Sequence, residues 1–506
     1  MSNTKTIARN TGWYGLENAI SAIVTLITAI MIARTLGPTK NGYIIYVNYI
    51  ASVVSTLGGV GIAATTRKYM AEFLGKDDQG TSRYIYFRTL WIQALLATLA
   101  TAGLAVWVLK ETSAGYRLAS LLIVLSIWPS MVNFISSQAN VAMEELSRNL
   151  PASVLSILVF FAGIAATVVF HWGVLGVGAA MFLMRTVDFA VRFVPTVKHI
   201  LAWTSTHIQP AGLYQRMTSF AWQSIASMIV AMIVWDRCEV LLLKNLCADV
   251  RQVAFYSVAF SMAERLLIGS RIFGSAAGAT IFAQYGRDKS RLPFITASTF
   301  RYLALTAIPL HCIATSLAVP ALLLLFGRQY AGAAMVCTFA PLLCMPKAFL
   351  SPVQSLLQST ERQSYVIMAT ALAGVIDVGV AWWLIQAHGA VGACIGSGAA
   401  QITAVGLMWA ICIKLYKVKL PWLMVAKISF ISLVAAFTAH LVAARFTPLW
   451  GILLGGCASL AVFFPLLYAM RVLEQKDGER MQIVFKLLPR GIGRQADAFM
   501  SLLIYP

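Results

Sequence analysis

The sequence is poor in charged residues, and acidic residues are especially scarce. Only 11% of its 506 residues are charged, with 19 Asp and Glu against 39 Lys and Arg, whereas soluble proteins carry about 25% charged residues. Hydrophobic residues make up 59% and the mean hydropathy is +0.76. No polar linker or charge block separates a soluble domain. This composition excludes an ordinary soluble fold and predicts an all-α polytopic membrane protein.

Motifs for catalysis and metal binding are also missing. The sequence contains no GxxxxGK[ST] loop, so the chain should not hydrolyse nucleotide by itself. The six histidines stand apart from one another, and the eight cysteines lie mostly within apolar runs and form no CxxC pair. No predicted outer loop is large enough to hold a catalytic domain. We therefore expect a protein that is not an enzyme and that holds no metal or other cofactor.

Apolar runs of about 20 residues, the length needed to cross a bilayer, recur along the chain. They predict about fourteen transmembrane helices. The predicted spans lie near residues 13–34, 43–63, 89–109, 118–139, 151–171, 174–194, 221–243, 253–274, 302–325, 331–358, 365–385, 390–413, 425–444 and 449–470.

The distribution of basic residues predicts the topology. With the N-terminus in the cytoplasm, 25 Lys and Arg fall in inner segments, 8 in outer loops and 6 inside the spans. The positive-inside rule then places both termini in the cytoplasm. The formal net charge of +20 is explained by this topology and by contact with anionic lipid head groups. No nucleic-acid partner is expected.

A weak internal repeat divides the chain. The segment FHWGVLGVGAA resembles AHGAVGACIGSGAA, with Gly173 and Gly389 offset by 216 residues, and Glu145 and Glu361 recur at the same offset. Because each repeat holds six helices, an even number, the two halves should have the same orientation in the membrane. We expect two pseudo-symmetric six-helix lobes and a C-terminal helix pair followed by an amphipathic tail. The predicted boundaries are 1–200, 201–415 and 416–506.

Charged side chains inside the predicted spans are the most informative residues. Each costs roughly 2.5–3.5 kcal/mol at the centre of an inserted helix, so they should face protein or a water-filled cavity. Two interpretations of the charged set in the middle of the chain are open: ion pairs that lock one conformation, or a cationic cavity wall that binds an anionic substrate. Arginine suits phosphate because its planar group donates two parallel hydrogen bonds. This set lies in a predicted hairpin over 219–274 and comprises Asp236, Arg237, Glu264, Arg265 and Arg271; the same hairpin also carries Glu239.

Predicted spans outside this hairpin also carry charged residues. Arg185, Asp188 and Arg192 recur at i, i+3 and i+7, a spacing that favours local pairing within one helix. Glu17 and Asp377 are acidic residues of predicted spans. Two roles are open for each of these residues, as for Asp236 and Glu264. The residue is the proton or cation site of a coupled carrier, or it is a salt-bridge partner.

Lys347 is the only lysine predicted to lie so deep in the membrane. It stands in the segment CMPKAFLSP, among Pro341, Pro346 and Pro352. Prolines free backbone carbonyl groups, so this stretch predicts a broken, bendable helix.

Four blocks of sequence occur in an order typical of one family. The blocks read IARTLGPTKNGYIIYVNYIASVVSTLGGVGIAATTRKYMAEF, DRCEVLLLKNL…VAFYSVAFSMAE, LLLLFGRQYAGAA and AHGAVGACIGSGAA. In the first, the A-R-x-L-G-P pattern is present, although Asn41 replaces the usual aromatic residue. Ala254 replaces a common Gly, and Asp377 stands where Asn is more typical. Over residues 1 to about 415 the chain resembles the Wzx-type polysaccharide biosynthesis (O-antigen) flippases of the multidrug/oligosaccharidyl-lipid/polysaccharide exporter superfamily.

This resemblance implies two six-helix lobes around a central cavity that opens to one side of the bacterial inner membrane at a time. The substrate would be undecaprenyl-pyrophosphate-linked oligosaccharide, moved outward for polysaccharide or lipopolysaccharide biosynthesis. Membrane lipids and a glycan polymerase or ligase of the same pathway would be partners. Cationic side chains would bind the pyrophosphate and acidic sugars. The candidates for this role are Arg34, Arg67, Arg237, Arg265, Arg271 and Lys347.

Three alternatives remain open. A cation-coupled multidrug exporter of the same superfamily would favour an acidic, aromatic cavity, and the excess of basic residues inside the spans argues against it. A lipid II flippase has fourteen helices too, so the two extra C-terminal helices are compatible with it. A membrane-embedded transferase or polymerase would need a large outer loop and catalytic carboxylates, which this sequence lacks.

Overall fold

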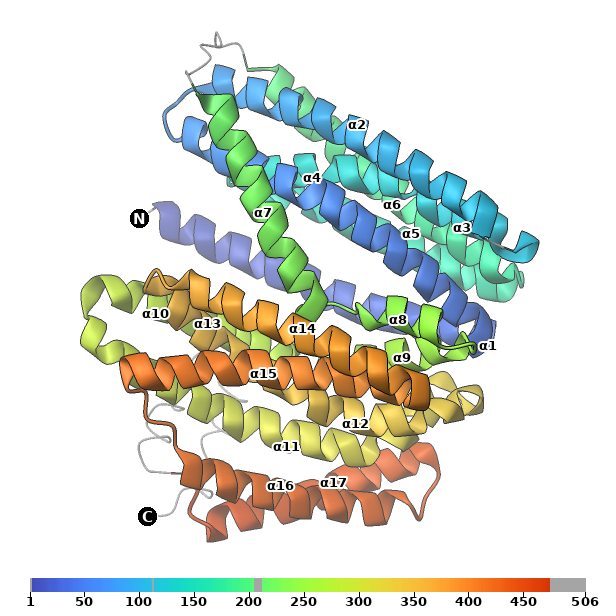
Figure 1. Ribbon diagram of the computed structural model, residues 1–506, viewed down its shortest axis with the longest axis vertical. Coiled ribbons are helices and arrows are strands. Elements are labelled where there is room, and N and C mark those ends of the chain that lie inside the picture. Colours follow the sequence, from blue (N-terminus) through green and yellow to red (C-terminus); the bar gives the residue numbers. More distant parts are fainter. Residues whose placement is uncertain (1, 112, 204–211, 474–506) are drawn as a thin grey trace. The chain divides into compact units, whose positions relative to one another are not determined.

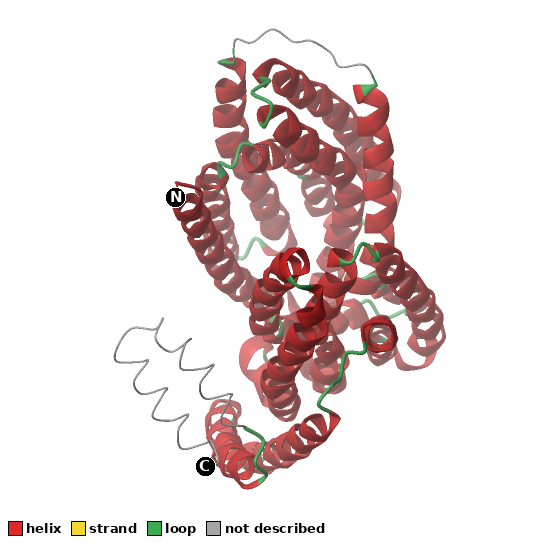
Figure 2. Cartoon of the chain, turned by 90° about the vertical axis from the view of Figure 1, so that its left-hand side faces the viewer, coloured by secondary structure: helices red, strands yellow, loops and turns green. Residues whose placement is uncertain are grey.

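The computed structural model describes residues 2–111, 113–203 and 212–473, and within these ranges it describes side chains from residue 21 onward with the exceptions of Glu111 and Leu146. Every regular element in these ranges is a helix, and Figure 2 shows these helices joined by short loops. The prediction of an all-α polytopic membrane protein is confirmed. The side chain of Glu17 and the predicted amphipathic tail lie outside the described residues.

Within the described ranges, twelve helices are long and apolar enough to cross a membrane, or thirteen if one bent pair counts as a span. The first of them, α1 (Ser2–Leu74), contains two of the predicted spans. Gly37 divides it with φ 70° and ψ 171°, a conformation that side chains with a Cβ rarely adopt, and Pro38 follows. Figure 1 shows the chain turning back there. Dividing α1 at Gly37 brings the number of spans to the expected fourteen.

The chain forms two compact units, Met1–Met232 and Ile233–Pro506. The first unit holds α1 and the helices up to α7, which continues into the second unit. Val47, Met131 and Ile164, each fully buried, lie in one apolar cluster of this unit, and Tyr86 and Ile200 lie in another. The helices after α1 are α2 (Gln79–Glu111), α3 (Ala114–Leu125), α4 (Ile127–Ala142), α5 (Leu150–Val169), α6 (Gly173–Leu201) and α7 (Leu213–Trp235).

The second unit contains the remaining helices, and the C-terminal pair α16–α17 packs on α11 within it. The repeat-based boundaries near residues 200 and 415 remain a prediction. The helices are α8 (Glu239–Leu246), α9 (Arg251–Leu266), α10 (Ile268–Arg287), α11 (Leu292–Phe326), α12 (Ala334–Cys344), α13 (Leu350–Ser359), α14 (Gln363–His388), α15 (Ala390–Tyr416), α16 (Trp422–Ala443) and α17 (Pro448–Ala469), with short 3-10 turns at η3 (Arg328–Ala333) and η4 (Met345–Phe349).

Helices α14 and α15 pack so closely that a glycine is required between them. A Cβ on Gly392 of α15 would lie 2.4 Å from the carbonyl carbon and oxygen of Leu384 in α14. Backbone atoms cannot move aside as a flexible side chain can. Gly406 of the same helix has no atom within 4 Å of its virtual Cβ. The pair therefore offers a matched test of this contact.

We expect Gly392→Ala to lower the free energy of unfolding by about 1–3 kcal/mol, the usual cost of overpacking. Gly406→Ala should leave it unchanged or raise it slightly, because alanine is the better helix former. Thermal unfolding of the purified protein in detergent micelles measures both. Equal melting temperatures for the two variants would show that the close α14–α15 contact is not present in solution.

Three spans of the second unit are interrupted. Residues 236–238 separate α7 from α8, Leu267 separates α9 from α10 with a bend of 48°, and η4 separates α12 from α13. The predicted break is confirmed at Pro346 in η4, whereas Pro341 stays inside α12. Irregular backbone at membrane depth is tolerated only where it is buried in protein or lines a water-filled cavity. A functional site of this unit is therefore expected in its interior, at these interruptions.

Candidate functional site

The intramembrane charges of the second unit gather at the interruptions of its helices. Arg237 lies between α7 and α8, Glu264 and Arg265 end α9, and Arg271 lies in the first turn of α10. Lys347 lies in η4. Four cationic residues therefore lie at these interruptions, and Glu264 is the carboxylate that forms ion pairs with two of them. We call these four, Arg237, Arg265, Arg271 and Lys347, the cationic cluster.

Aromatic packing fixes the position of Lys347. Trp409 of α15 donates a hydrogen bond from Nε1 to the carbonyl oxygen of Phe349, at 3.1 Å. The ring of Phe300 in α11 lies 4.9 Å from the ring centroids of both Phe349 and Trp409. These contacts attach η4 to two long helices. The position of Lys347 is thereby fixed at the break between α12 and α13.

Glu264 joins two members of the cationic cluster. Lys347 Nζ donates to Glu264 Oε1 at 2.8 Å and to the carbonyl oxygen of Trp235 at 3.1 Å. Arg271 pairs with the other oxygen, Glu264 Oε2. The Lys347 and Glu264 side chains are only 11% and 18% exposed. The ion-pair interpretation of Glu264 therefore agrees with this geometry, although its partners are Lys347 and Arg271 and not the neighbouring Arg265.

Removing this carboxylate should destabilise the second unit. We expect Glu264→Gln to lower the free energy of unfolding by roughly 3 kcal/mol, because it leaves a mostly buried Lys347 without a counter-charge. Glu72→Gln is the matched control, since Glu72 also contacts two cations, Lys76 and Arg216, but both of these are more than half exposed. Its cost should stay below about 1 kcal/mol.

Chemical denaturation in micelles measures both variants. The double variant Glu264→Gln/Lys347→Met should recover much of the loss, because it removes the orphaned charge along with its partner. If Glu264→Gln were no more costly than Glu72→Gln, the Lys347–Glu264 pair would not be buried in solution.

Arg237 and Arg265 are different from Arg271 and Lys347. Within the described residues neither has an ion pair within 4.0 Å. Arg237 donates to Ser261 Oγ at 3.0 Å and lies over the ring of Phe260 at 4.9 Å. Arg265 is close enough to Arg237 and Arg271 for the guanidinium groups to repel one another. These two cations therefore remain available to an anion that enters the cluster.

The other two predicted substrate-binding cations, Arg34 and Arg67, belong to the first unit. Both are exposed on α1, on opposite sides of the break at Gly37. About 30 helical residues separate the break from Arg67, roughly 45 Å at 1.5 Å per residue. One phosphate group cannot contact both at once, and their predicted role stays a prediction. Asp236 is exposed.

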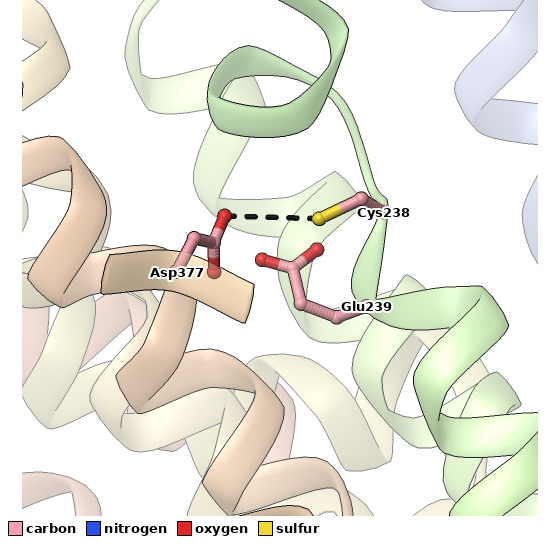
Figure 3. Close-up of side chains that lie close together, drawn as sticks. All are labelled: Cys238, Glu239 and Asp377. Atoms are coloured by element: carbon pink, nitrogen blue, oxygen red, sulfur yellow. Dashed lines mark hydrogen bonds between the residues drawn. The ribbon is translucent and has the colours of Figure 1, made fainter. Parts of the chain in front are cut away.

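A second polar cluster of the same unit consists of two buried carboxyl groups and a thiol. Glu239 begins α8, Asp377 lies in the middle of α14, and neither has any exposed surface. Figure 3 shows their carboxyl groups facing each other, with Cys238 beside them. Cys238 Sγ donates to Asp377 Oδ2 at 3.7 Å. One ligand atom from each of the three residues lies within 4.8 Å of the others.

The two carboxyl groups are poorly satisfied. Tyr256 and Ser397 lie beside Glu239, yet neither oxygen of Glu239 nor Oδ1 of Asp377 has a hydrogen bond of good geometry among the described residues. No cation of that part of the chain forms an ion pair with either group. Two adjacent buried carboxylates cannot both stay charged without a counter-charge. The arrangement can therefore hold a shared proton or a small cation with a preference for oxygen ligands.

The sequence pointed to only half of this pair. Asp377 was expected to be a coupling site or a salt-bridge partner, and among the described residues it has no salt bridge. Glu239 was one of the intramembrane charges, but no role was predicted for it. Its only signal was its place beside Asp236 and Arg237. The pairing of Glu239 with Asp377 joins residues that are 138 positions apart.

Comparison with solved structures identifies the fold. A lipid II flippase MurJ in an inward closed conformation superposes with a TM-score of 0.73 at 12% identity, covering 90% of this chain and 98% of that one. An inward-facing multidrug resistance MATE family transporter of the MOP superfamily gives a TM-score of 0.65 at 14% identity, covering 78% and 95%. At these identities the likeness establishes the fold alone, which is that of membrane flippases and transporters.

Comparison of sequences identifies the family. The succinoglycan biosynthesis transport protein ExoT of Rhizobium meliloti (strain 1021) is 23% identical over 375 residues, which cover 69% of this chain and 68% of that protein. The sequence model of the family described as polysaccharide biosynthesis protein matches residues 7–282, more than half of the chain. The resemblance found in the sequence motifs is thereby confirmed, and the chain belongs to the polysaccharide biosynthesis protein family of multi-pass membrane transporters.

Proposed function

We propose that this protein is a flippase that moves undecaprenyl-pyrophosphate-linked oligosaccharide outward across the bacterial inner membrane, with both termini in the cytoplasm. Its membership of the polysaccharide biosynthesis protein family and its similarity to a succinoglycan biosynthesis transport protein support this role. The observation that carries the proposal is the cationic cluster, in which Arg237 and Arg265 have no carboxylate partner among the described residues. A pyrophosphate carries the opposite charge and accepts the bidentate hydrogen bonds of arginine.

The same cluster argues against a multidrug exporter for cationic compounds. Arg237, Arg265, Arg271 and Lys347 would repel a cationic drug. The one carboxylate among them, Glu264, is already shared by Lys347 and Arg271. An anionic head group gains from every member of the cluster.

We infer that the transport cycle is coupled to a proton or a small cation at the Glu239–Asp377 pair. Glu239 lies in α8 and Asp377 in α14. The repulsion between their two carboxylates is relieved only when the pair binds a positive charge. A binding event that stabilises one conformation over another can drive alternating access. The division of the chain into two compact units is compatible with the rocking of two halves that such a cycle requires.

The proposed function is tested by the sidedness of the lipid-linked oligosaccharide in a strain that lacks this gene. A membrane-impermeant lectin or glycosidase applied to spheroplasts detects units on the outer leaflet only. We expect completed units to be trapped on the inner leaflet, and the plasmid-borne gene to release them. Lipid II accessibility, measured in the same spheroplasts, should not change. Unchanged oligosaccharide sidedness would overturn the proposal, and a change in lipid II alone would favour the lipid II alternative.

A further inference from the structure

Helix α6 of the first unit carries three charged residues on one face, and the structure neutralises only two of them. Arg192 donates to Asp188 Oδ1 at 2.8 Å and to Ser153 Oγ at 2.9 Å. Asn133 Nδ2 donates to Asp188 Oδ2 at 2.7 Å. The predicted local pairing is thus confirmed for Asp188 and Arg192. It does not include Arg185.

Arg185 forms no hydrogen bond or ion pair with any of the described residues. The carboxylate nearest to it along α6 is Asp188, and both oxygens of that group are already engaged by Asn133 and Arg192. The Arg185 side chain is exposed, and it lines an open cavity of the first unit.

This open cavity is small and its wall is polar. Its volume is about 110 Å³, enough for roughly three or four waters at about 30 Å³ each. That space accommodates a carboxylate or phosphate group. Hydroxyl or amide side chains from α1, the α3–α4 junction and α4 line most of the remaining wall: Asn48, Ser52, Ser55, Thr56, Ser126 and Ser130.

One of these hydroxyl groups independently indicates a missing ligand. Ser55 is only 6% exposed and lines the cavity, and its Oγ is buried without a hydrogen-bond partner among the described residues. Buried hydroxyl groups in native proteins are nearly always satisfied, by protein, water or a ligand. An arginine without a contact partner and an unsatisfied serine hydroxyl therefore face the same small polar space.

We propose that this cavity is an oxyanion-binding site that receives a carboxylate or phosphate substituent carried on the oligosaccharide part of the substrate. The arginine fork donates two parallel hydrogen bonds to such a group and keeps its charge at every physiological pH. The surrounding hydroxyls donate to its remaining lone pairs and to neighbouring sugar hydroxyls. This inference rests on the proposed function for the identity of the substrate. The site itself is built entirely from the first unit.

The test is a binding measurement that does not depend on transport. Purified full-length protein carrying Arg237→Ala and Arg265→Ala, which removes the cations of the cationic cluster that have no ion pair among the described residues, is titrated calorimetrically in lipid nanodiscs with glucuronate, with inorganic phosphate and with glucose. We expect glucuronate or phosphate to bind and glucose not to bind. Arg185→Gln should weaken the binding at least tenfold, and Ser55→Ala should weaken it several-fold. Arg251→Gln, which removes an exposed arginine at the start of α9, should have no effect.

Each result has a distinct meaning. Preference for glucuronate assigns an acidic sugar, and preference for phosphate assigns a phosphate substituent. Arg185→Lys should retain part of the affinity, because it keeps the charge but loses the fork. Melting temperatures of the variants equal to that of the wild type show that loss of binding is not loss of fold. Anion binding that Arg185→Gln leaves intact, or no binding of either anion, would overturn the site. Intact sidedness of the oligosaccharide in the deletion strain would instead overturn the flippase function alone.

Discussion

Replacing Arg237 or Arg265 with alanine should lower export of lipid-linked oligosaccharide by at least about tenfold while leaving the amount of protein in the membrane unchanged. A hydrogen bond to a charged group contributes roughly 1.5–3 kcal/mol, and about 1.4 kcal/mol corresponds to a factor of ten. Neither arginine has a carboxylate partner among the described residues. Removing either arginine therefore leaves no unpaired negative charge and lowers the electrostatic repulsion within the cationic cluster.

The stability and the export of these variants should consequently change independently. Arg237→Lys and Arg265→Lys should keep part of the export, because the charge remains and only the bidentate geometry is lost. Arg251→Ala provides the control, since Arg251 is 55% exposed and pairs with Asp249 outside the cluster. Export is measured as the outer-leaflet fraction of the oligosaccharide. Wild-type export by both alanine variants would rule out a role for the cationic cluster in binding the substrate.

The cost of placing charge in a bilayer allowed much of the second unit to be predicted from its sequence. That cost placed Arg237, Glu264 and Lys347 in the protein interior, and the prolines around Lys347 predicted the broken helix in which it lies. The partner of Glu264 could not be predicted in the same way. Lys347 is 83 residues away in the chain and belongs to another predicted span. The ion pairs expected within the hairpin over 219–274 therefore did not include it.

The sequence also could not predict which arginine of α6 pairs with Asp188. The spacing of Arg185, Asp188 and Arg192 permits Asp188 to pair in either direction along α6. Asn133 of α4 occupies one carboxylate oxygen and Arg192 the other, so a residue from a different helix determines that Arg185 stays without a contact partner. Periodicity alone describes one helix at a time. It therefore predicted the pairing but not the cation that was left over.

Neutralising the buried carboxyl pair should have the second large effect. We expect Asp377→Asn and Glu239→Gln each to reduce energised export to the level reached without an ion gradient. Both changes keep the shape of the side chain but remove the group that binds a proton or cation. The protein should be at least as stable as before, because an unsatisfied buried carboxyl is replaced by a neutral amide. Asp249→Asn, in the loop after α8, should leave export unchanged.

The measurement separates coupling from binding. Proteoliposomes that contain the purified protein and labelled lipid-linked oligosaccharide are energised first with a proton gradient and then with a sodium gradient. The wild type should respond to one of them, which identifies the ion, and Asp377→Asn should respond to neither while still binding substrate through the cationic cluster. Because each single variant already abolishes a shared site, the double variant should be no worse than either single variant if the two residues form one site. Additive losses would mean that Glu239 and Asp377 act separately, and a gradient response retained by both single variants would exclude the pair from coupling.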